Sequence, residues 1–385
     1  MKIACTQENL NQGLSIVSSI SGKNPNLPIL NNVLIKAKKE GIILSSTNLE
    51  IGINCSIRGK VEEEGEFTVP ARVFFDYINL LNKGNVALEL KEQELQIITE
   101  NNKTRIKGNA AEDFPTIPEI KRGDKYEIKI KDLKEAISKI IFAVASNSAR
   151  PEINGVYFEL KGEENIGIMA ATDSFRLAEI KIPIKADNKQ RKIVIIPNKT
   201  LHEVLRIISA LKENEEKNEK KVKIYISEDN QILFSFPDPK MGTEDTIELV
   251  SRLIEGNYPE YQEIIPKNHE TKVLVERSEL INVVKTSSLF TKSGANSIKM
   301  EILGNENELT VYSANAETGE NLSKISAKVE GEKNEITLNY KYLIDGLQSV
   351  DTNEVVLEVI NKDVPCLLKP YKKDNYLYII MPIRA

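Results

Sequence analysis

Residues Tyr376-Leu377-Tyr378-Ile379-Ile380 form an apolar run, and Met381-Pro382-Ile383-Arg384-Ala385 follow it directly at the carboxyl end. The run predicts a buried strand. Chain ends are usually polar and frayed, whereas this one joins apolar side chains to a single arginine. We therefore expect the tail to be held against the fold, where it can form the wall of a pocket.

Two other segments combine apolar and cationic residues in the same way. One reads Ala-Thr-Asp-Ser-Phe-Arg-Leu-Ala from Ala171 to Ala178. The other reads Ser-Arg-Leu-Ile-Glu-Gly-Asn-Tyr-Pro from Ser251 to Pro259. These three segments are the first candidates for a common binding site.

An internal repeat organises the whole chain. Apolar residues recur at the helical spacing i, i+4, i+7 in patterns that begin at Leu10, Phe74, Leu133, Leu201, Leu280 and Leu343. Within successive pairs the patterns are 64, 68 and 63 residues apart, and the odd-numbered patterns are 123 and then 147 apart. A regular interval nested in a longer one predicts repeated structural units.

Short alternating strands fill the intervals between the predicted helices, for example Val86–Leu90 and Val222–Ile226. The fold class is therefore α+β, with three tandem similar domains that each pack two helices on antiparallel sheets. Aromatic and proline residues at Asp113–Pro118 and Asn257–Tyr261 precede charged stretches. We place the domains at residues 1–124, 125–267 and 268–385.

The composition is that of a soluble globular protein, with 41% hydrophobic and 28% charged residues among 385. No apolar run reaches the roughly 18 residues of a membrane-spanning helix, and the N-terminal residues lack the apolar core of a signal peptide. Three scattered cysteines indicate a reducing compartment. We expect a cytoplasmic protein that does not contact membranes.

Charge is distributed unevenly between the predicted helices and the rest of the chain. The whole chain has a net charge of −5, yet the six helical segments together carry +4, so everything else carries −9. Helices arranged around a polyanion, with the sheets facing outward, would show this asymmetry. Lysine-rich helix faces are common on soluble proteins, so the pattern gains weight only beside the repeat.

Recognisable catalytic motifs are absent from the sequence, and two histidines leave few candidates for a general base or a metal ligand. Thr172-Asp173-Ser174 could form an acid–nucleophile pair, but no histidine accompanies it. We expect a binding protein without catalytic, metal or cofactor sites. A hydrolase that uses two carboxylates is the rival from a different class.

The three segments resemble signature segments of the bacterial DNA polymerase III beta subunit, the replicative sliding clamp. Asn26–Asn32 and Thr68–Arg72 are similar to further motifs of that family, and the resemblance covers essentially the whole chain. It implies the DNA clamp fold and a head-to-tail homodimeric ring that encircles duplex DNA without sequence preference. It also implies that the replicative polymerase and the clamp loader bind through short linear motifs. A clamp-fold scaffold that is not loaded on DNA is the alternative.

The family captures its partners in an apolar pocket between the second and third domains. Carried over to this chain, the pocket consists of Ile153, Thr172, Ser174, Phe175, Arg176, Leu177, Pro259, Ile264, Ile379, Ile380, Met381, Pro382, Ile383 and Arg384. The resemblance assigns Arg176 and Arg384 to orient polar groups of the peptide. Ser174-Phe175 stands where Gly-His is common, and Glu263 stands where an arginine is common. Both departures would alter peptide preference.

DNA contacts and the dimer interface complete the predicted sites. The resemblance places DNA contacts at Lys23, Asn24, Arg72, Asn147 and Arg150. For the dimer, we expect Thr104 and Ile106 of one copy to face Leu289 and Phe290 of the other.

Overall fold

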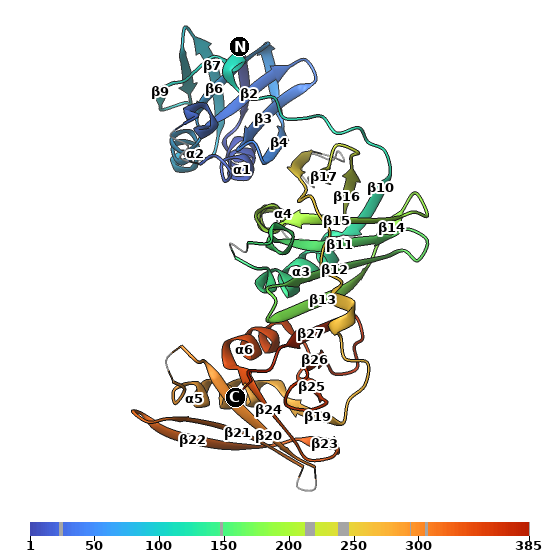
Figure 1. Ribbon diagram of the computed structural model, residues 1–385. Helices are drawn as coiled ribbons and strands as arrows, with labels where there is room; N and C mark the ends of the chain where they lie inside the picture. The colour runs from blue at the N-terminus through green and yellow to red at the C-terminus, as the bar shows by residue number, and fades with distance from the viewer. Residues whose placement is uncertain are drawn as a thin grey trace. The chain divides into compact units, whose positions relative to one another are not determined.

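A computed structural model describes residues 1–22, 26–146, 149–211, 220–237, 246–292, 294–304 and 307–384 (Figure 1). The chain divides into two compact units. Unit 1 comprises residues 1–131, 184–189 and 199–253, and unit 2 comprises residues 132–183, 190–198 and 254–385. Within the described residues, no helix is long and apolar enough to cross a membrane.

Unit 1 contains two sheets, of five and nine strands. Its elements are β1 (Lys2–Thr6), α1 (Gln7–Val17), β2 (Asn32–Lys38), β3 (Gly41–Thr47), β4 (Ile51–Ile57), β5 (Gly59–Glu63), β6 (Gly65–Pro70), α2 (Ala71–Leu80), β7 (Asn85–Lys91), β8 (Glu94–Ile98), β9 (Lys103–Lys107), β10 (Lys125–Lys129), β14 (Lys185–Ala186), β16 (Lys221–Ile226), β17 (Gln231–Phe236) and β18 (Ile247–Arg252), with α4 (Asn198–Ala210) from its second residue onward.

Unit 2 contains sheets of nine and four strands. Its elements are β11 (Gly155–Lys161), β12 (Ile166–Thr172), β13 (Arg176–Pro183), β15 (Arg191–Pro197), β19 (Thr271–Glu276), α5 (Arg277–Ser288), β20 (Ser297–Leu303), β21 (Glu308–Asn315), β22 (Gly319–Ser326), β23 (Lys328–Gly331), β24 (Asn334–Asn339), α6 (Tyr340–Ser349), β25 (Glu354–Val359), β26 (Cys366–Pro370) and β27 (Tyr376–Ile380), with α3 (Ile130–Ile140) from its third residue onward.

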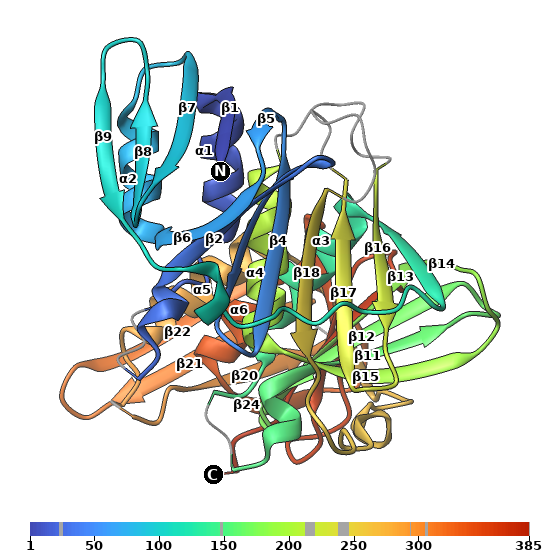
Figure 2. The ribbon, with the colours of Figure 1, turned by 90° about the horizontal axis from the view of Figure 1, so that it is seen from above.

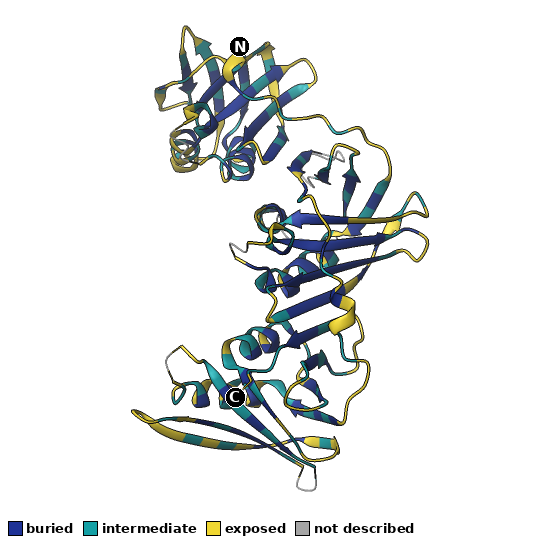
Figure 3. Ribbon diagram, viewed as in Figure 1, coloured by how far each residue is buried: buried dark blue, intermediate teal, exposed yellow. Residues whose placement is uncertain are grey.

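All six predicted helices are present where the periodicity placed them. The apolar triplet of α1, Leu10/Leu14/Val17, is fully buried, and its hydroxyl cap is Thr6, which accepts from the backbone N–H of Asn9. Buried residues gather in the sheet strands and on single faces of the helices (Figure 3). Amphipathic helices on antiparallel sheets therefore make up the α+β fold that the sequence predicts.

Each nine-stranded sheet joins strands that are distant in sequence. In unit 1, β18 pairs antiparallel with β4, with Ser251 opposite Ile51 (Figure 2). In unit 2, β13 pairs antiparallel with β27, with Arg176 opposite Ile380. Each pairing joins two predicted domains through one continuous sheet. We call the β18–β4 pairing and its surroundings the first junction, and the β13–β27 pairing and its surroundings the second junction. Because the sheets are continuous, the division between the two compact units falls inside the predicted second domain. The domain boundaries at 124 and 267 stay a prediction.

Arg206 of α4 strengthens the first of these junctions, within unit 1. Its guanidinium donates to the carbonyl oxygens of Ser15 (2.8 Å) and Ile16, in the last turn of α1. Its Nε also donates to Glu203, whose carboxylate accepts from Ser19 at 2.8 Å. A cation at a helix C-terminus satisfies carbonyls that have no partner within the helix.

Candidate functional site

The carboxyl-terminal tail is held in place, as the sequence predicts. Strand β27 lies between β13 and β26. Beyond the strand, the N–H of Met381 donates to the carbonyl of Phe175 (2.9 Å), and the N–H of Ile383 donates to the carbonyl of Thr337 (2.8 Å). Met381, Pro382 and Ile383 are half-buried, and Arg384 is exposed. The tail therefore has a fixed backbone and side chains that remain partly accessible.

The loop Thr172–Arg176 is closed by internal hydrogen bonds and lies directly beside the tail. The Thr172 hydroxyl donates to the carbonyl of Arg176 (2.7 Å), and Asp173 Oδ1 accepts from the N–H groups of Phe175 and Arg176, each at 3.0 Å. Ser174 has φ +78°, in the left-handed region that non-glycine residues rarely adopt. The loop presents Phe175 to solvent with 61% of its surface exposed.

Arg176 has a structural role in the loop, beside the peptide contact that the resemblance assigns to it. Its guanidinium donates to Asp173 (3.0 Å), Asp345 (2.5 Å) and the carbonyl of Phe142 (2.7 Å). It also lies over the Phe142 and Tyr342 rings, at 5.3 and 4.6 Å from the ring centroids. These contacts engage all three guanidinium nitrogens, so Arg176 fixes the loop to α6. Its part in peptide binding stays a prediction.

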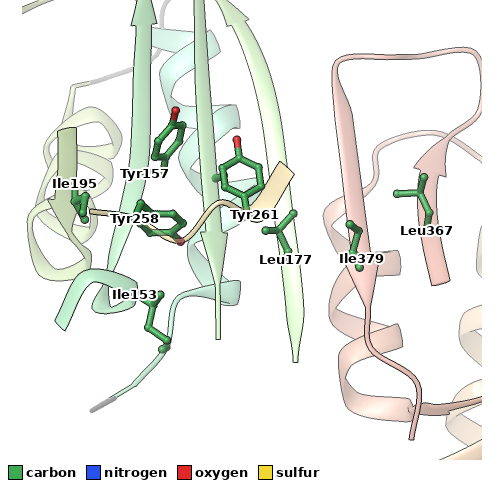
Figure 4. Packing of buried hydrophobic residues seen from close by; sticks show 10 residues of the cluster. Ile153, Tyr157, Leu177, Ile195, Tyr258, Tyr261, Leu367 and Ile379 are labelled. Carbon is green, nitrogen blue, oxygen red and sulfur yellow. The ribbon is translucent and has the colours of Figure 1, made fainter. Parts of the chain in front are cut away.

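A buried apolar cluster lies beneath the loop and the tail (Figure 4). Ile153, Leu177 and Ile379 are members of it, at 2% exposure or less. The segment Tyr258–Ile264 covers part of the cluster, with the Tyr157 and Tyr261 rings in edge contact at 5.4 Å. These predicted pocket residues therefore form a floor that supports the exposed ones.

Two tyrosine–glutamate hydrogen bonds fix this floor. Tyr157 donates to Glu159 (3.1 Å), and Tyr261 donates to Glu179 (2.7 Å). Burial, reinforced by the charge of Glu159, raises the pKa of Tyr157 to about 12. Burial, followed by the charge of Glu179, also raises the pKa of Tyr261. Both hydroxyls therefore stay protonated donors throughout the physiological pH range.

The predicted pocket residues thus fall into three groups. Buried are Ile153, Thr172, Leu177, Ile379 and Ile380; half-buried are Arg176, Pro259, Met381, Pro382 and Ile383; exposed are Ser174, Phe175, Ile264 and Arg384. All of them belong to unit 2. These predicted residues offer a partner an apolar surface with one exposed cation, Arg384.

The predicted DNA contacts are described only in part. Lys23, Asn24 and Asn147 lie outside the described residues. Arg72, on the first turn of α2, has 85% of its side chain exposed, with Asp76 at 3.7 Å. Arg150 instead donates through Nη2 to the Ser174 hydroxyl. The structure therefore places Arg150 beside the loop Thr172–Arg176.

The predicted dimer residues lie on an edge strand of unit 1 and at the end of a helix of unit 2. Strand β9 is an edge of the five-stranded sheet; there Ile106 is buried, and Thr104 donates to the Tyr77 hydroxyl at 2.8 Å. In unit 2, Leu289 follows α5 and is 72% exposed, and Phe290 is half-buried. Ile106 thus packs inside its own unit, whereas Leu289 is available to a partner.

Sequence reasoning missed three exposed apolar residues near these edges. Val73 and Leu80 of α2 are 56% and 82% exposed, and Leu322 of edge strand β22 is 59% exposed. The signal for the first two was available: they are seven residues apart, on a different helix face from the buried pair Phe74 and Ile78. Leu322 could not be distinguished from an inward-facing strand residue.

Comparisons with known proteins agree along the whole chain. Three family models match: the DNA polymerase III beta subunit N-terminal domain at residues 1–118, its central domain at 127–260 and its C-terminal domain at 262–384. A beta sliding clamp of Staphylococcus aureus is 32% identical over 369 residues, which are 93% of each chain. That of Staphylococcus epidermidis is 32% identical over 386 residues, 98% of this chain and 97% of the relative.

Solved structures show the same fold. The DNA polymerase III beta subunit of Thermotoga maritima superposes with a TM-score of 0.88 at 27% identity, covering 100% of this chain and 99% of that one. The DNA polymerase sliding clamp of Bacillus subtilis superposes with a TM-score of 0.90 at 25% identity, with the same coverage. With three clamp domains, tail and loop all in place, the chain belongs to the DNA polymerase III beta subunit family, the bacterial beta sliding clamps.

Proposed function

We propose that two copies of this chain assemble head to tail into a ring that encircles duplex DNA and tethers the replicative polymerase. The ring holds DNA by topology, and its role is processivity without a catalytic step of its own. It works in the cytoplasm, where the clamp loader and the polymerase bind it through short linear motifs. Membership of the sliding-clamp family supports this function.

The observation that carries the dimer is a pair of uncovered sheet edges. Strand β9 ends one sheet of unit 1; it is bonded through Thr104 to Tyr77 of α2, the helix that exposes Val73 and Leu80. Strand β22 ends one sheet of unit 2, beside the exposed Leu289. Open edges with apolar neighbours are an aggregation hazard unless another chain covers them. Joining β9 of one copy to β22 of the other covers both edges, and repeating the contact closes the ring.

Peptide capture is assigned to the surface formed by the loop Thr172–Arg176 and the tail. Its floor is a buried, hydrogen-bonded cluster, and its exposed side chains, Phe175 and Ile264, suit leucine or phenylalanine anchors. Arg150, held at Ser174, supplies a cation at the rim. We therefore move Arg150 from the DNA-facing set to the peptide surface.

Topological retention tests the function directly. The protein, loaded by a clamp loader onto nicked circular DNA, is expected to remain bound through gel filtration and to leave after the circle is cut once. A non-topological binder would show the same retention on both forms. Equal retention on circular and linear DNA, or none on either, would favour the alternative of a scaffold that is not loaded.

Phosphate contact by Arg72 is expected to be weak and independent of sequence. Replacing Arg72 by alanine should lower the salt dependence of linear-DNA binding by about one unit of the log–log slope, because one fewer counterion is released. Asp76→Ala is the matched control: it removes the carboxylate beside Arg72 and should leave that slope unchanged or steeper. Fluorescence anisotropy across a salt series measures both variants. An unaltered slope for Arg72→Ala removes this residue from the DNA-facing set.

A further inference from the structure

Unit 1 contains a second copy of the loop that borders the candidate peptide surface. In Thr47–Ile51, the Thr47 hydroxyl donates to the carbonyl of Ile51 (2.9 Å), and Asn48 Oδ1 accepts from the N–H groups of Glu50 (3.0 Å) and Ile51 (2.8 Å). Leu49 has φ +76°, against +78° at Ser174. The same bonds and the same strained position occur in Thr172–Arg176.

Each loop also accepts a backbone hydrogen bond from the strand that pairs beside it, or from the residue that follows that strand. Arg252, at the end of β18, donates its N–H to the carbonyl of Glu50 at 3.1 Å. This bond corresponds to the one between Met381 and Phe175. The repeat therefore includes the equivalent of the tail as well as the loop.

A short 3-10 helix is the third element that the two junctions share. It spans Pro28–Asn31 in unit 1 and Pro151–Asn154 in unit 2. The N–H of Leu30 donates to the carbonyl of Leu27 (3.1 Å), as that of Ile153 does to Arg150 (3.3 Å). Leu27 thus takes the place of Arg150, and Leu49 takes the place of Ser174. At the second junction, Arg150 donates to the Ser174 hydroxyl. At the first junction, the same two positions are occupied by Leu27 and Leu49, which are 44% and 49% exposed.

Beneath the connecting segment 111–122, unit 1 also contains a cavity of about 940 Å³. Strands β2, β3, β4 and β18 form its floor, and Phe114, Ile117 and Ile120 contribute to its roof. At one end, Ile117 packs so closely on Gly52 that a Cβ there would lie 2.6 Å from Ile117 Cγ2. Gly52 follows the loop Thr47–Ile51 directly, so this loop ends beside Ile117, a lining residue of the cavity.

At the second junction, aromatic rings pack together where the first junction has aliphatic side chains. Tyr157, Tyr258 and Tyr261 pack with ring centroids 5.4 to 6.2 Å apart. Leu34 takes the place of Tyr157 at the first junction, since each follows its 3-10 helix by the same interval. At the first junction, the smaller side chain of Leu34 lines the cavity where the second junction has the Tyr157 ring.

The chemistry of the cavity favours a neutral, extended ligand. Its cations Lys36 and Arg122 lie near Glu66 (3.7 Å) and Glu248 (2.6 Å). The third lining cation, Lys38, is outnumbered by Glu112 and Glu119, so little net charge is left to attract a phosphate. The Thr246 hydroxyl, in a residue only 4% exposed that lines the cavity, has no hydrogen-bond partner among the described residues. A peptide backbone can satisfy such a group, and the volume lies within the roughly 300–1,000 Å³ of ligand pockets.

We propose that this first-junction groove, formed by Leu27, Leu49 and the cavity beneath residues 111–122, is a second docking site for a short linear peptide. Two apolar side chains of the peptide bind at the leucines and under Ile117 and Ile120, and its backbone reaches Thr246. This inference rests on the proposed function, because the ligand belongs to the same class as the partner motifs. The two sites differ in preference: the second junction carries Arg150 at its rim, whereas the first is apolar there.

Methyl NMR of the full-length protein, labelled at isoleucine Cδ1, separates the two sites. The probe is an acetylated hexapeptide that ends in Leu-Phe. The methyls of Ile43, Ile117 and Ile120 are expected to shift on titration, also in a chain that lacks residues 381–385. The double variant Leu27→Ser/Leu49→Asn should weaken these shifts about tenfold in apparent affinity. Asparagine tolerates a positive φ, so this variant keeps the loop.

Two results would overturn the proposed docking site at the first junction. One is that the methyl resonances of Ile43, Ile117 and Ile120 do not shift at about 1 mM peptide. The other is that they shift with the same apparent affinity in the double variant. The methyls of Ile264, Ile379 and Ile383 report on the second junction in the same spectra. Their failure to move would count against peptide capture in the proposed function, whatever the first junction does. The two failures are therefore read from different resonances.

Discussion

A chain that lacks residues 381–385 is expected to lose at least about thirty-fold in affinity for a Leu-Phe peptide at the second junction, and to remain a folded dimer. The deletion removes the half-buried Met381, Pro382 and Ile383 together with the exposed Arg384. Truncating one anchor contact at a hot spot costs about 2 kcal/mol or more, which corresponds to about thirty-fold. Losing a whole wall should reach or exceed that value.

Stability is expected to fall only modestly in the truncated chain. Strand β27 keeps its pairing with β13 and β26, because the deletion begins after Ile380. Two backbone hydrogen bonds are lost, from Met381 to Phe175 and from Ile383 to Thr337, each worth about 1 kcal/mol. Thermal melting beside the peptide titration measures this cost.

The matched control is Arg384→Ala in the intact chain, which removes the cation and keeps the tail backbone. It should weaken binding by less than the deletion does, because the apolar wall survives. Peptide affinity of the truncated protein within about threefold of the intact chain would make the tail a purely structural element. A truncated protein that no longer dimerises would instead tie the tail to assembly.

Local patterns predicted local structure well. Leu10, Leu14 and Val17 are separated by one helical turn each, and burying them requires only that the helix forms and meets a sheet. The apolar run Tyr376–Ile380 likewise became a strand with both neighbours paired. These features depend on residues within about ten positions of one another, where periodicity carries the information.

Local patterns could not predict which residues or strands pair when they are far apart in the sequence. Arg176 binds Asp345, 169 residues away, and no local pattern around either residue indicates this structural pairing. The pairing of β18 with β4 likewise joins two domains, and alternation in either strand does not name its neighbour. The internal repeat was visible as helical spacing, but the match between the loops Thr47–Ile51 and Thr172–Arg176 emerged only from their hydrogen bonds.

The double variant Leu289→Asp/Leu322→Asp is expected to be a monomer of 43.3 kDa, whereas the unaltered chain should be a dimer of twice that mass. Burying each leucine against a second copy contributes roughly 2 kcal/mol, so losing both costs about 4 kcal/mol, or about a thousand-fold in dissociation constant. Two carboxylates that must be desolvated against Val73 and Leu80 add to this cost. Sedimentation equilibrium measures the masses.

Folding of each monomer should be almost unaffected, because Leu289 and Leu322 are 72% and 59% exposed. Exposed substitutions usually change the free energy of unfolding by less than about 0.5 kcal/mol. Ile193→Asp provides the matched control: it also replaces an exposed apolar residue on an edge strand, β15, outside both proposed surfaces. That variant should remain a dimer. Monomeric Ile193→Asp, or a double variant that stays dimeric, would place the interface elsewhere. If the interface is as proposed, the double variant also slides off closed circular DNA, because a single open chain cannot enclose the duplex.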